Sequence, residues 1–149
     1  MRYRIMRAED LELLAPLYAE YFNSEEDSCW TPERAYKRLH QLLSIDGSYG
    51  LVAEEGGEPA GFCIGCFQVF ADLDAFEISE ILVFKRFQGS GRGSEFVREV
   101  ERRVRELGAP TMQLEAVNDE MHDHFYGKLG FKYSKTNLPM CKWIGTDEQ

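Results

Sequence analysis

The sequence predicts an α/β fold in which a mixed β-sheet carries helices on both faces. The length of 149 residues, 44% of them hydrophobic, suits one domain with its own core. β-rich runs and amphipathic helical patterns follow one another in the order β-α-α-β-β-β-α-β-α-β-β. A glycine-rich turn joins one of these strands to a long helix. We therefore expect residues 1–149 to form a single domain.

The first half of the chain predicts a strand, two helices and a hairpin. Residues 5–7 predict the strand, and Glu9 and Asp10 can cap the first helix. Thr31 followed by Pro32 predicts the start of the second helix, because the first turn of a helix needs no backbone donor from proline. Two β-rich runs, residues 49–55 and 60–69, flank turn-forming residues and predict the hairpin.

The second half predicts a strand, a long helix, a strand, a short helix and two closing strands. The first strand covers residues 75–84, and Gly108 ends the helix that follows the glycine-rich turn. After a strand over residues 111–117, Asn118 and Asp119 can cap a short helix. The predicted closing strands are residues 131–134 and 140–144, and a polar tail covers residues 146–149.

Charge and hydropathy exclude several classes of protein. A formal charge of -9 disfavours binding to nucleic acid or to an anionic membrane and suits a cationic partner. No apolar run approaches the roughly 20 residues that span a bilayer. The N-terminal residues lack the apolar segment of a secretory signal, so we expect a cytoplasmic protein.

The cysteines do not predict a metal site. Cys63 and Cys66 form a C-x-x-C pair within a strand-like run, where their odd spacing directs the two thiols to opposite faces. No second pair of ligands stands near them in the sequence. We expect free thiols and no bound metal.

The glycine-rich turn is the clearest candidate binding site. A strand, a turn with three glycines and a helix together form an anion cradle, because backbone N–H groups and the positive end of the helix dipole converge there. The turn is not a phosphate-binding Walker loop, since no Gly-Lys-Ser/Thr follows. It is not a dinucleotide fingerprint either, because Ser94 stands where the last glycine is needed.

The strand and turn together resemble the acetyl-coenzyme A motif of the GNAT superfamily of N-acetyltransferases. That motif is a strand ending in apolar-x-Val, a short step, and Arg/Gln-x-x-Gly-x-Gly/Ala at the start of a long helix. Here Ile81-Leu82-Val83 precedes Gln88-Gly89-Ser90-Gly91-Arg92-Gly93-Ser94. The order of elements along nearly the whole chain is also similar to that of the family.

The resemblance implies acetyl-CoA as the acetyl donor. Backbone N–H groups of the turn would bind its pyrophosphate, from the residues Gln88, Gly89, Ser90, Gly91, Arg92, Gly93 and Ser94. The strand edge at Leu82 and Val83 would pair with the pantetheine arm and orient the thioester, where backbone donors stabilise an oxyanion. Arg92 and Lys128 are further candidates for contact with the phosphates of the coenzyme.

A second segment resembles another sequence motif of this family, Asn-x-x-(small)-x-x-Phe/Leu-Tyr-x-x-x-Gly-Phe. Asn118 begins it, one residue farther from Tyr126 than in the usual form, and Gly130-Phe131 ends it. The resemblance implies that Asn118 contacts the cofactor. It also implies that Tyr126 is the general acid that protonates the leaving thiolate.

Two carboxylates are candidates for the general base that takes a proton from the acceptor ammonium. Strand alternation puts Ile78, Glu80 and Leu82 on one face, so that Glu80 would lie among apolar neighbours that raise its pKa. Glu77 falls on the opposite face, but a bulge in this strand would change the parity. Glu80 is the favoured base, Glu77 is its rival, and an ordered water is a third option.

The acetyl acceptor is the part of the predicted reaction that the sequence specifies least. By resemblance, the acidic loop with Glu25, Glu26 and Asp27 lies at the rim of the acceptor site, where with Trp30 it would select a small cationic amine. A protein amine is an alternative acceptor, and a non-catalytic acyl-CoA sensor is an alternative function. Homodimers are common in this family, so the closing strands are also a candidate dimer interface.

Overall fold

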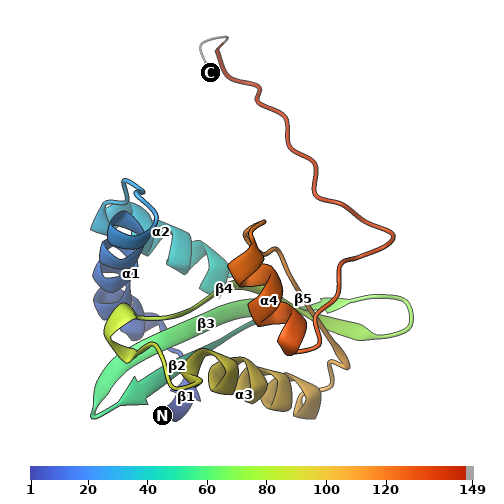
Figure 1. Cartoon of the computed structure of the whole chain (residues 1–149), viewed down its shortest axis with the longest axis horizontal. Helices are drawn as coiled ribbons and strands as arrows, with labels where there is room; N and C mark the ends of the chain where they lie inside the picture. Colours follow the sequence, from blue (N-terminus) through green and yellow to red (C-terminus); the bar gives the residue numbers. More distant parts are fainter. Residues whose placement is uncertain (147–149) are drawn as a thin grey trace. The chain divides into compact units, whose positions relative to one another are not determined.

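The computed structural model describes residues 1–146 and divides into two compact units, Met1–Val117 and Asn118–Gln149 (Figure 1). Of the predicted polar tail, residues 147–149 lie outside the described residues.

The first unit contains the sheet and three of the four α-helices of the described chain. Its elements, in order, are β1 (Arg2–Ile5), the 3-10 turn η1 (Ala8–Asp10), α1 (Leu11–Glu25), α2 (Pro32–Leu43), β2 (Ser48–Glu55), β3 (Glu58–Val69), β4 (Asp74–Val83), the 3-10 turn η2 (Lys85–Phe87), α3 (Arg92–Glu106) and β5 (Thr111–Leu114). The predicted elements of this region are present, with ends that differ by a few residues.

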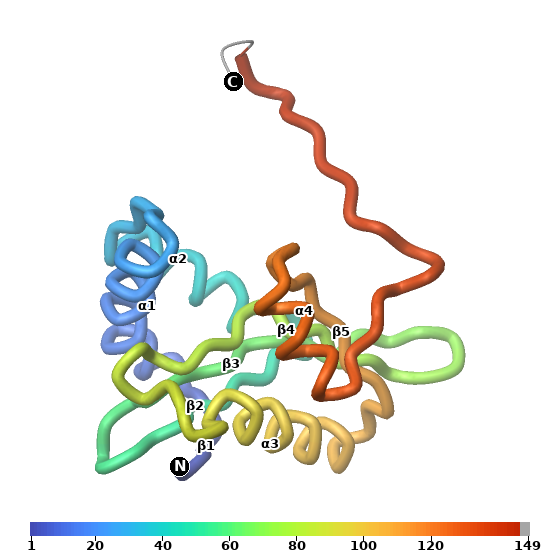
Figure 2. Tube along the Cα trace, in the orientation of Figure 1, coloured from blue at the N-terminus to red at the C-terminus, as the bar shows by residue number. Residues whose placement is uncertain are grey.

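The sheet is mixed, as the sequence predicts. Its order is β1-β2-β3-β4-β5, which follows the order of the chain and can be traced in Figure 2. The pairs β1–β2, β2–β3 and β3–β4 are antiparallel, and β5 runs parallel to β4. Because a parallel pair needs a long crossover, α3 fills the connection from β4 to β5.

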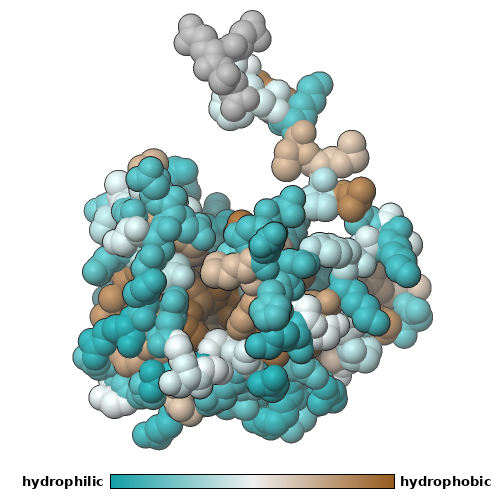
Figure 3. Space-filling model, viewed as in Figure 1, coloured by the Kyte–Doolittle hydropathy of each residue, from teal (hydrophilic) through white to brown (hydrophobic). Residues whose placement is uncertain are grey.

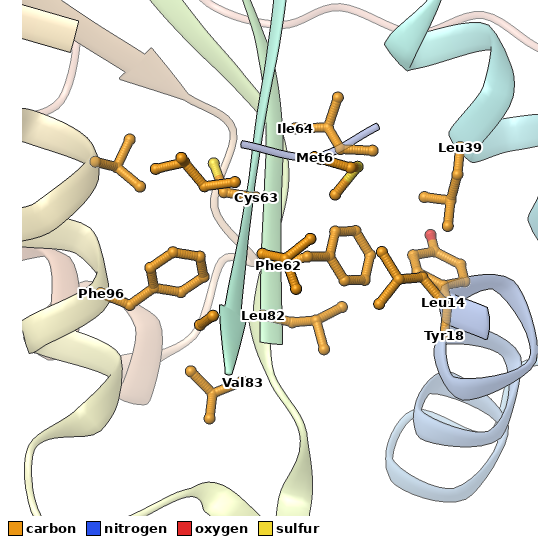
Figure 4. Close-up of a cluster of buried hydrophobic side chains, with 14 of the residues drawn as sticks. Met6, Leu14, Tyr18, Leu39, Phe62, Cys63, Ile64, Leu82, Val83 and Phe96 are labelled. Carbon is orange, nitrogen blue, oxygen red and sulfur yellow. The ribbon is translucent and has the colours of Figure 1, made fainter. Parts of the chain in front are cut away.

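Helices cover both faces of this sheet, which confirms the predicted layers. Figure 4 shows Tyr18 of α1 and Leu39 of α2 packed on one side of the strands and Phe96 of α3 on the other. Phe62 and Phe96 are 0% exposed and form the centres of the two layers. β4 therefore lies in the sheet between the layer of α1 and α2 and the layer of α3 (Figure 4).

Of the caps predicted for α1 and α2, the structure contains the one for α2 but not the one for α1. Thr31 caps α2 as expected, since its hydroxyl accepts a hydrogen bond from the Arg34 backbone N–H at 3.1 Å. Asp10 precedes α1, but its carboxylate accepts from the Arg7 backbone N–H at 2.7 Å and pairs with both terminal nitrogens of Arg4 at 2.8 and 2.9 Å. Asp10 therefore ties the start of α1 to β1.

Replacing Asp10 should lower the stability of the fold at neutral pH but have a smaller effect in acid. The hydrogen bond from Arg4 lowers the pKa of Asp10, and the Arg7 backbone N–H adds to the effect. Because the pKa is lower in the folded state, the stabilisation is present above the unfolded value of about 4 and is lost as the pH falls through the folded pKa. We expect Asp10→Asn to lower the free energy of unfolding by about 1 kcal/mol at neutral pH, since Arg4 is half exposed. Urea denaturation at neutral pH and at about pH 3 checks this, and an equal loss at both would contradict it.

The second unit contains one helix, α4 (Glu120–Lys128). Asp119 caps it as predicted, because its carboxylate accepts a hydrogen bond from the His122 backbone N–H at 2.7 Å. Gly130 follows the helix with a φ of 92°, a left-handed conformation that favours glycine.

The two predicted closing strands were wrong. Residues 131–134 and 140–144 form no strand in the described chain, although their composition favours one. A strand needs a partner for its backbone hydrogen bonds, and this unit supplies none among the residues described. Large apolar side chains in this stretch stay exposed, among them Met140 at 94% and Ile144 at 87%, and Figure 3 shows hydrophobic residues along it.

Within residues 1–146, every helix is too short or too polar to cross a bilayer.

Candidate functional site

The glycine-rich turn between η2 and α3 has a left-handed backbone at three successive residues. The φ angles are 97° at Gly89, 54° at Ser90 and 76° at Gly91. A side chain at Gly89 or Gly91 would meet no other atom within 4 Å, so packing does not require glycine there. The backbone conformation favours it, because L side chains disfavour positive φ.

This conformation leaves a row of backbone donors without partners. The N–H groups of Gly89, Ser90 and Gly91 donate no hydrogen bond to any of residues 1–146. Gly93 and Ser94 lie in the first turn of α3, where backbone N–H groups have no acceptor within the helix. Together with the helix dipole, these donors suit an anion such as a pyrophosphate.

Two side chains of the turn make contacts within the protein. The Gln88 side-chain amide donates to the Val83 carbonyl at 2.9 Å and to the Tyr21 hydroxyl at 3.2 Å. Arg92 donates to the Phe87 carbonyl at 3.2 Å and pairs with Glu55 at 2.9 Å. Both side chains therefore hold the turn in place, which leaves the backbone as its main source of anion contacts.

The edge of β4 near this turn is open. β5 pairs with β4 only over residues 75–78, so residues 79–83 have no strand on that edge within the described chain. Leu82 and Val83 lie in this open stretch, where backbone N–H and C=O groups can pair with an amide-bearing ligand. The turn thus offers backbone donors to an anion, and the open edge offers backbone donors and acceptors to an extended ligand.

A β-bulge in β4 decides where the two candidate carboxylates lie. Ile64 of β3 pairs with Glu80 while the next residue, Gly65, pairs with Ile78, so Ser79 is the extra residue. The bulge reverses the alternation, and Cys66 of β3 pairs with Glu77.

As a result, Glu77 and Glu80 lie on the same face of the sheet, the face covered by α1 and α2. The expected grouping of Ile78 with Glu80 on one face was wrong, because simple alternation does not include the extra residue.

Glu80 is held by two donors from the helices above it. Its Oε1 accepts a hydrogen bond from the Tyr18 hydroxyl at 2.9 Å and from Arg38 Nε at 2.7 Å. Its side chain is only 12% exposed. Burial and then the charge of Glu80 raise the pKa of the Tyr18 phenol, so Tyr18 stays protonated and donates at neutral pH. The surroundings of Glu80 are thus polar and cationic as well as apolar.

Glu77 has a neutral partner instead. Its Oε2 accepts a hydrogen bond from the Gln113 side chain of β5 at 2.8 Å, and the same amide lies 3.3 Å from Gln68 of β3. Burial and then the nearby Glu77 raise the pKa of the Cys66 thiol. Glu77 and Glu80 therefore differ chiefly in the charge of the group that holds them.

The predicted acceptor loop joins α1 to α2. Glu25, the last residue of α1, pairs with Lys85 of η2 at 3.4 Å, so a cation already lies beside this carboxylate. The Trp30 ring lies against the Tyr18 ring, with 5.2 Å between their centroids. The Asn23 side chain accepts a hydrogen bond from the Trp30 backbone N–H and donates one to the Trp30 carbonyl. Glu26 and Asp27 are exposed.

The remaining predicted site residues belong to the second unit. Tyr126 is half-buried between Phe125 and Phe131, with ring centroids 5.0 and 5.4 Å away. Asn118 and Lys128 are exposed.

The first unit thus brings the turn, the β4 carboxylates and the α1–α2 loop onto one framework. Sequence reasoning missed Arg38 and Gln113 as partners of the carboxylates, because neither lies in a motif.

Comparisons with known proteins identify the family of this chain. A sequence model described as the acetyltransferase (GNAT) family matches residues 11–131. A relative from Archaeoglobus fulgidus, named as an uncharacterized N-acetyltransferase, is 33% identical over an alignment of 119 residues that covers 72% of this chain and 80% of the relative.

Solved structures show the same fold. The structure of a possible acetyltransferase from Clostridium difficile 630 has a TM-score of 0.80 at 13% identity, over 97% of this chain and 98% of that one. A predicted acetyltransferase from Clostridium acetobutylicum, solved with acetyl-CoA, has a TM-score of 0.72 at 16% identity, over 94% of this chain and 95% of that one. With the family match over most of its length, this chain belongs to the acetyltransferase (GNAT) family.

Proposed function

We propose that this acetyltransferase moves the acetyl group of acetyl-CoA onto a primary amine of a small cationic acceptor. The observation that carries the proposal is the row of unpartnered backbone donors at Gly89, Ser90 and Gly91. This row follows β4, the strand that bears Glu77 and Glu80, after the short turn η2. Enzymes of this family use acetyl-CoA, and the turn offers the donors that its pyrophosphate needs. Acetyl-CoA, when bound, supplies an activated thioester.

The cofactor contacts in this proposal come mainly from the backbone. The turn would bind the pyrophosphate and the open β4 edge at Leu82 and Val83 would pair with the pantetheine arm. Asn118 and Lys128 are proposed contacts from the second motif. Arg92 is the weakest of the proposed contacts, since Glu55 and the Phe87 carbonyl already engage it.

The proton transfers are assigned to two side chains. The acceptor arrives as an ammonium, and Glu80 takes one of its protons directly or through a water so that the nitrogen lone pair can form the new C–N bond. Tyr126 would give its phenolic proton to the sulfur as the C–S bond breaks, and the second proton that the nitrogen loses as the amide forms would restore the phenol, while Glu80 releases its proton to solvent. The balance is one ammonium and one thioester consumed, and one amide, one thiol and one proton formed.

The proposed preference for a cationic acceptor rests on charge. The chain carries a formal charge of -9, and Glu26 and Asp27 are exposed in the α1–α2 loop. Glu25 contributes less than the sequence suggests because Lys85 pairs with it. Trp30 would act through its packing against Tyr18, which holds this loop to α1.

We also propose that both units work as one cytoplasmic domain. The family match over residues 11–131 extends across the boundary at Val117 and Asn118.

An assay of thiol release tests the proposed function. The full chain is incubated with acetyl-CoA and an acceptor panel of a polyamine, an aminoglycoside and a lysine-containing peptide, with a neutral alcohol as the control. We expect at least one small cationic amine to raise the rate of thiol release well above the rate without acceptor. Coenzyme A that raises the melting temperature while every amine leaves the rate unchanged would indicate a non-catalytic sensor. Stimulation by the peptide alone would point to a protein acceptor.

Substitution in the turn should weaken coenzyme binding specifically. Gly91→Ala forces a side chain into the left-handed region at a φ of 76°, so the backbone donors move from their positions. We expect the Kd for coenzyme A to rise by roughly tenfold, measured by isothermal titration calorimetry. Gly56→Ala is the matched control, because Gly56 has a φ of 62° and open surroundings in the β2–β3 hairpin. An equal change of Kd in both variants would contradict a role for the turn.

A further inference from the structure

Glu80 is the meeting point of three elements of the first unit. The carboxylate comes from β4, the Tyr18 hydroxyl from α1 and the Arg38 guanidinium from α2. Arg38 is separated from Glu80 by 42 positions in sequence and lies in no motif, so nothing in the chain's pattern links the two.

Both donors bind the same carboxylate oxygen. Tyr18 and Arg38 reach Oε1 at 2.9 and 2.7 Å, whereas Oε2 accepts no hydrogen bond from residues 1–146. Two donors from different helices fix the rotation of a carboxylate, because each restricts the oxygen from a different direction. The second oxygen is then presented in one orientation with its lone pairs available.

Arg38 suits this role because its charge is permanent. Burial alone would lower the pKa of Arg38, but the hydrogen bond and charge of Glu80 outweigh it and raise the pKa. Its side chain is 41% exposed, so its long stem reaches Glu80 from the surface of α2. An arginine here therefore stays charged while Glu80 exchanges protons.

We propose that Arg38 is a positioning residue for acetyl transfer, which with Tyr18 holds Glu80 through Oε1 so that Oε2 faces the acceptor ammonium. This inference rests on the proposed function, since it requires Glu80 to receive the proton. Arg38 touches neither the acceptor nor the coenzyme in this scheme and acts through Glu80 alone.

Steady-state kinetics on Arg38 variants test the inference. Arg38→Met keeps the aliphatic stem and removes both the charge and the donor, so we expect kcat to fall by about tenfold or more with the KM for acetyl-CoA changed by less than about twofold. Arg38→Lys keeps the charge and one donor and should recover part of the loss. Arg34→Met is the matched control, because Arg34 lies one turn earlier on α2 and pairs with no acid among the described residues. It should keep the wild-type kcat.

A double-mutant cycle separates positioning from a general effect on the fold. If Arg38 acts through Glu80, Arg38→Met should cause no further loss in a Glu80→Gln background, while melting temperatures of Arg38→Met and Arg34→Met should agree within a few degrees. A wild-type kcat in Arg38→Met, or an equal fold-loss in both backgrounds, would overturn the inference. A fully active Glu80→Gln would overturn it too and leave acetyl transfer itself standing. A wild-type chain with no acetyl transfer would instead reject the proposed function.

Discussion

Glu80→Gln is expected to lower kcat for acetyl transfer by about 100-fold or more, with little change in coenzyme affinity. The amide has the shape of the carboxylate but cannot accept a proton from the acceptor ammonium, and general-base catalysis typically contributes 10²–10⁴-fold. Coenzyme affinity should persist because the turn binds through backbone groups at Gly89, Ser90 and Gly91. Rates of thiol release and calorimetric Kd values measure the two effects separately.

Glu77→Gln is the matched control for this variant. Glu77 lies on the same strand and, because of the bulge at Ser79, on the same face of the sheet. Its partner is the neutral Gln113 amide, which leaves it without the cation that holds Glu80. We expect a loss of only a few fold in kcat. A large loss of kcat in Glu77→Gln, together with a nearly normal kcat in Glu80→Gln, would make Glu77 the general base. A normal kcat in both variants would make a water the proton acceptor.

Gly65→Ala should destabilise the fold by about 3 kcal/mol and lower the melting temperature by roughly 10 °C. Gly65 is opposite the bulge, where an added Cβ would lie 2.3 Å from the Glu77 carbonyl oxygen and 2.5 Å from a carbon of the Phe76 ring. The first of these is backbone in the neighbouring strand, so relief requires β3 and β4 to separate. Thermal and urea denaturation measure the loss.

Gly127→Ala serves as the control for adding a methyl group. A Cβ at Gly127 meets no other atom within 4 Å, and the position lies inside α4. Alanine is the better helix former, so we expect unchanged or slightly higher stability. A Gly65→Ala protein as stable as wild type would show that the close approach at the bulge is relieved at little cost, and would weaken the structural basis for placing both carboxylates on one face.

The predictable parts of the fold are those with strong local signals. Thr31-Pro32 and Asp119 start helices as expected, because a side-chain oxygen meets a free backbone donor within the same turn of chain. The strand, turn and helix around Gly91 were predictable from the motif, since the positive φ angles there depend on local glycine chemistry.

Other parts depend on partners that are distant in sequence. The bulge at Ser79 arises from pairing with β3, so alternation within β4 could indicate only that Glu77 and Glu80 were candidates. Arg38 reaches Glu80 from another helix, and no local pattern marks it. Residues 140–144 have strand-forming composition but no strand partner in the described chain, which is why the prediction there was wrong.

The most direct test of the central claim follows the acetyl group itself. Acetyl-CoA labelled with deuterium in its methyl group is incubated with the full chain and the most active amine of the acceptor panel, and the acceptor is then analysed by mass spectrometry. We expect one labelled acetyl group on the acceptor for each coenzyme thiol released, with product formation reduced by about 100-fold or more in Glu80→Gln. Thiol release without labelled acceptor, or the same yield with and without the protein, would contradict it.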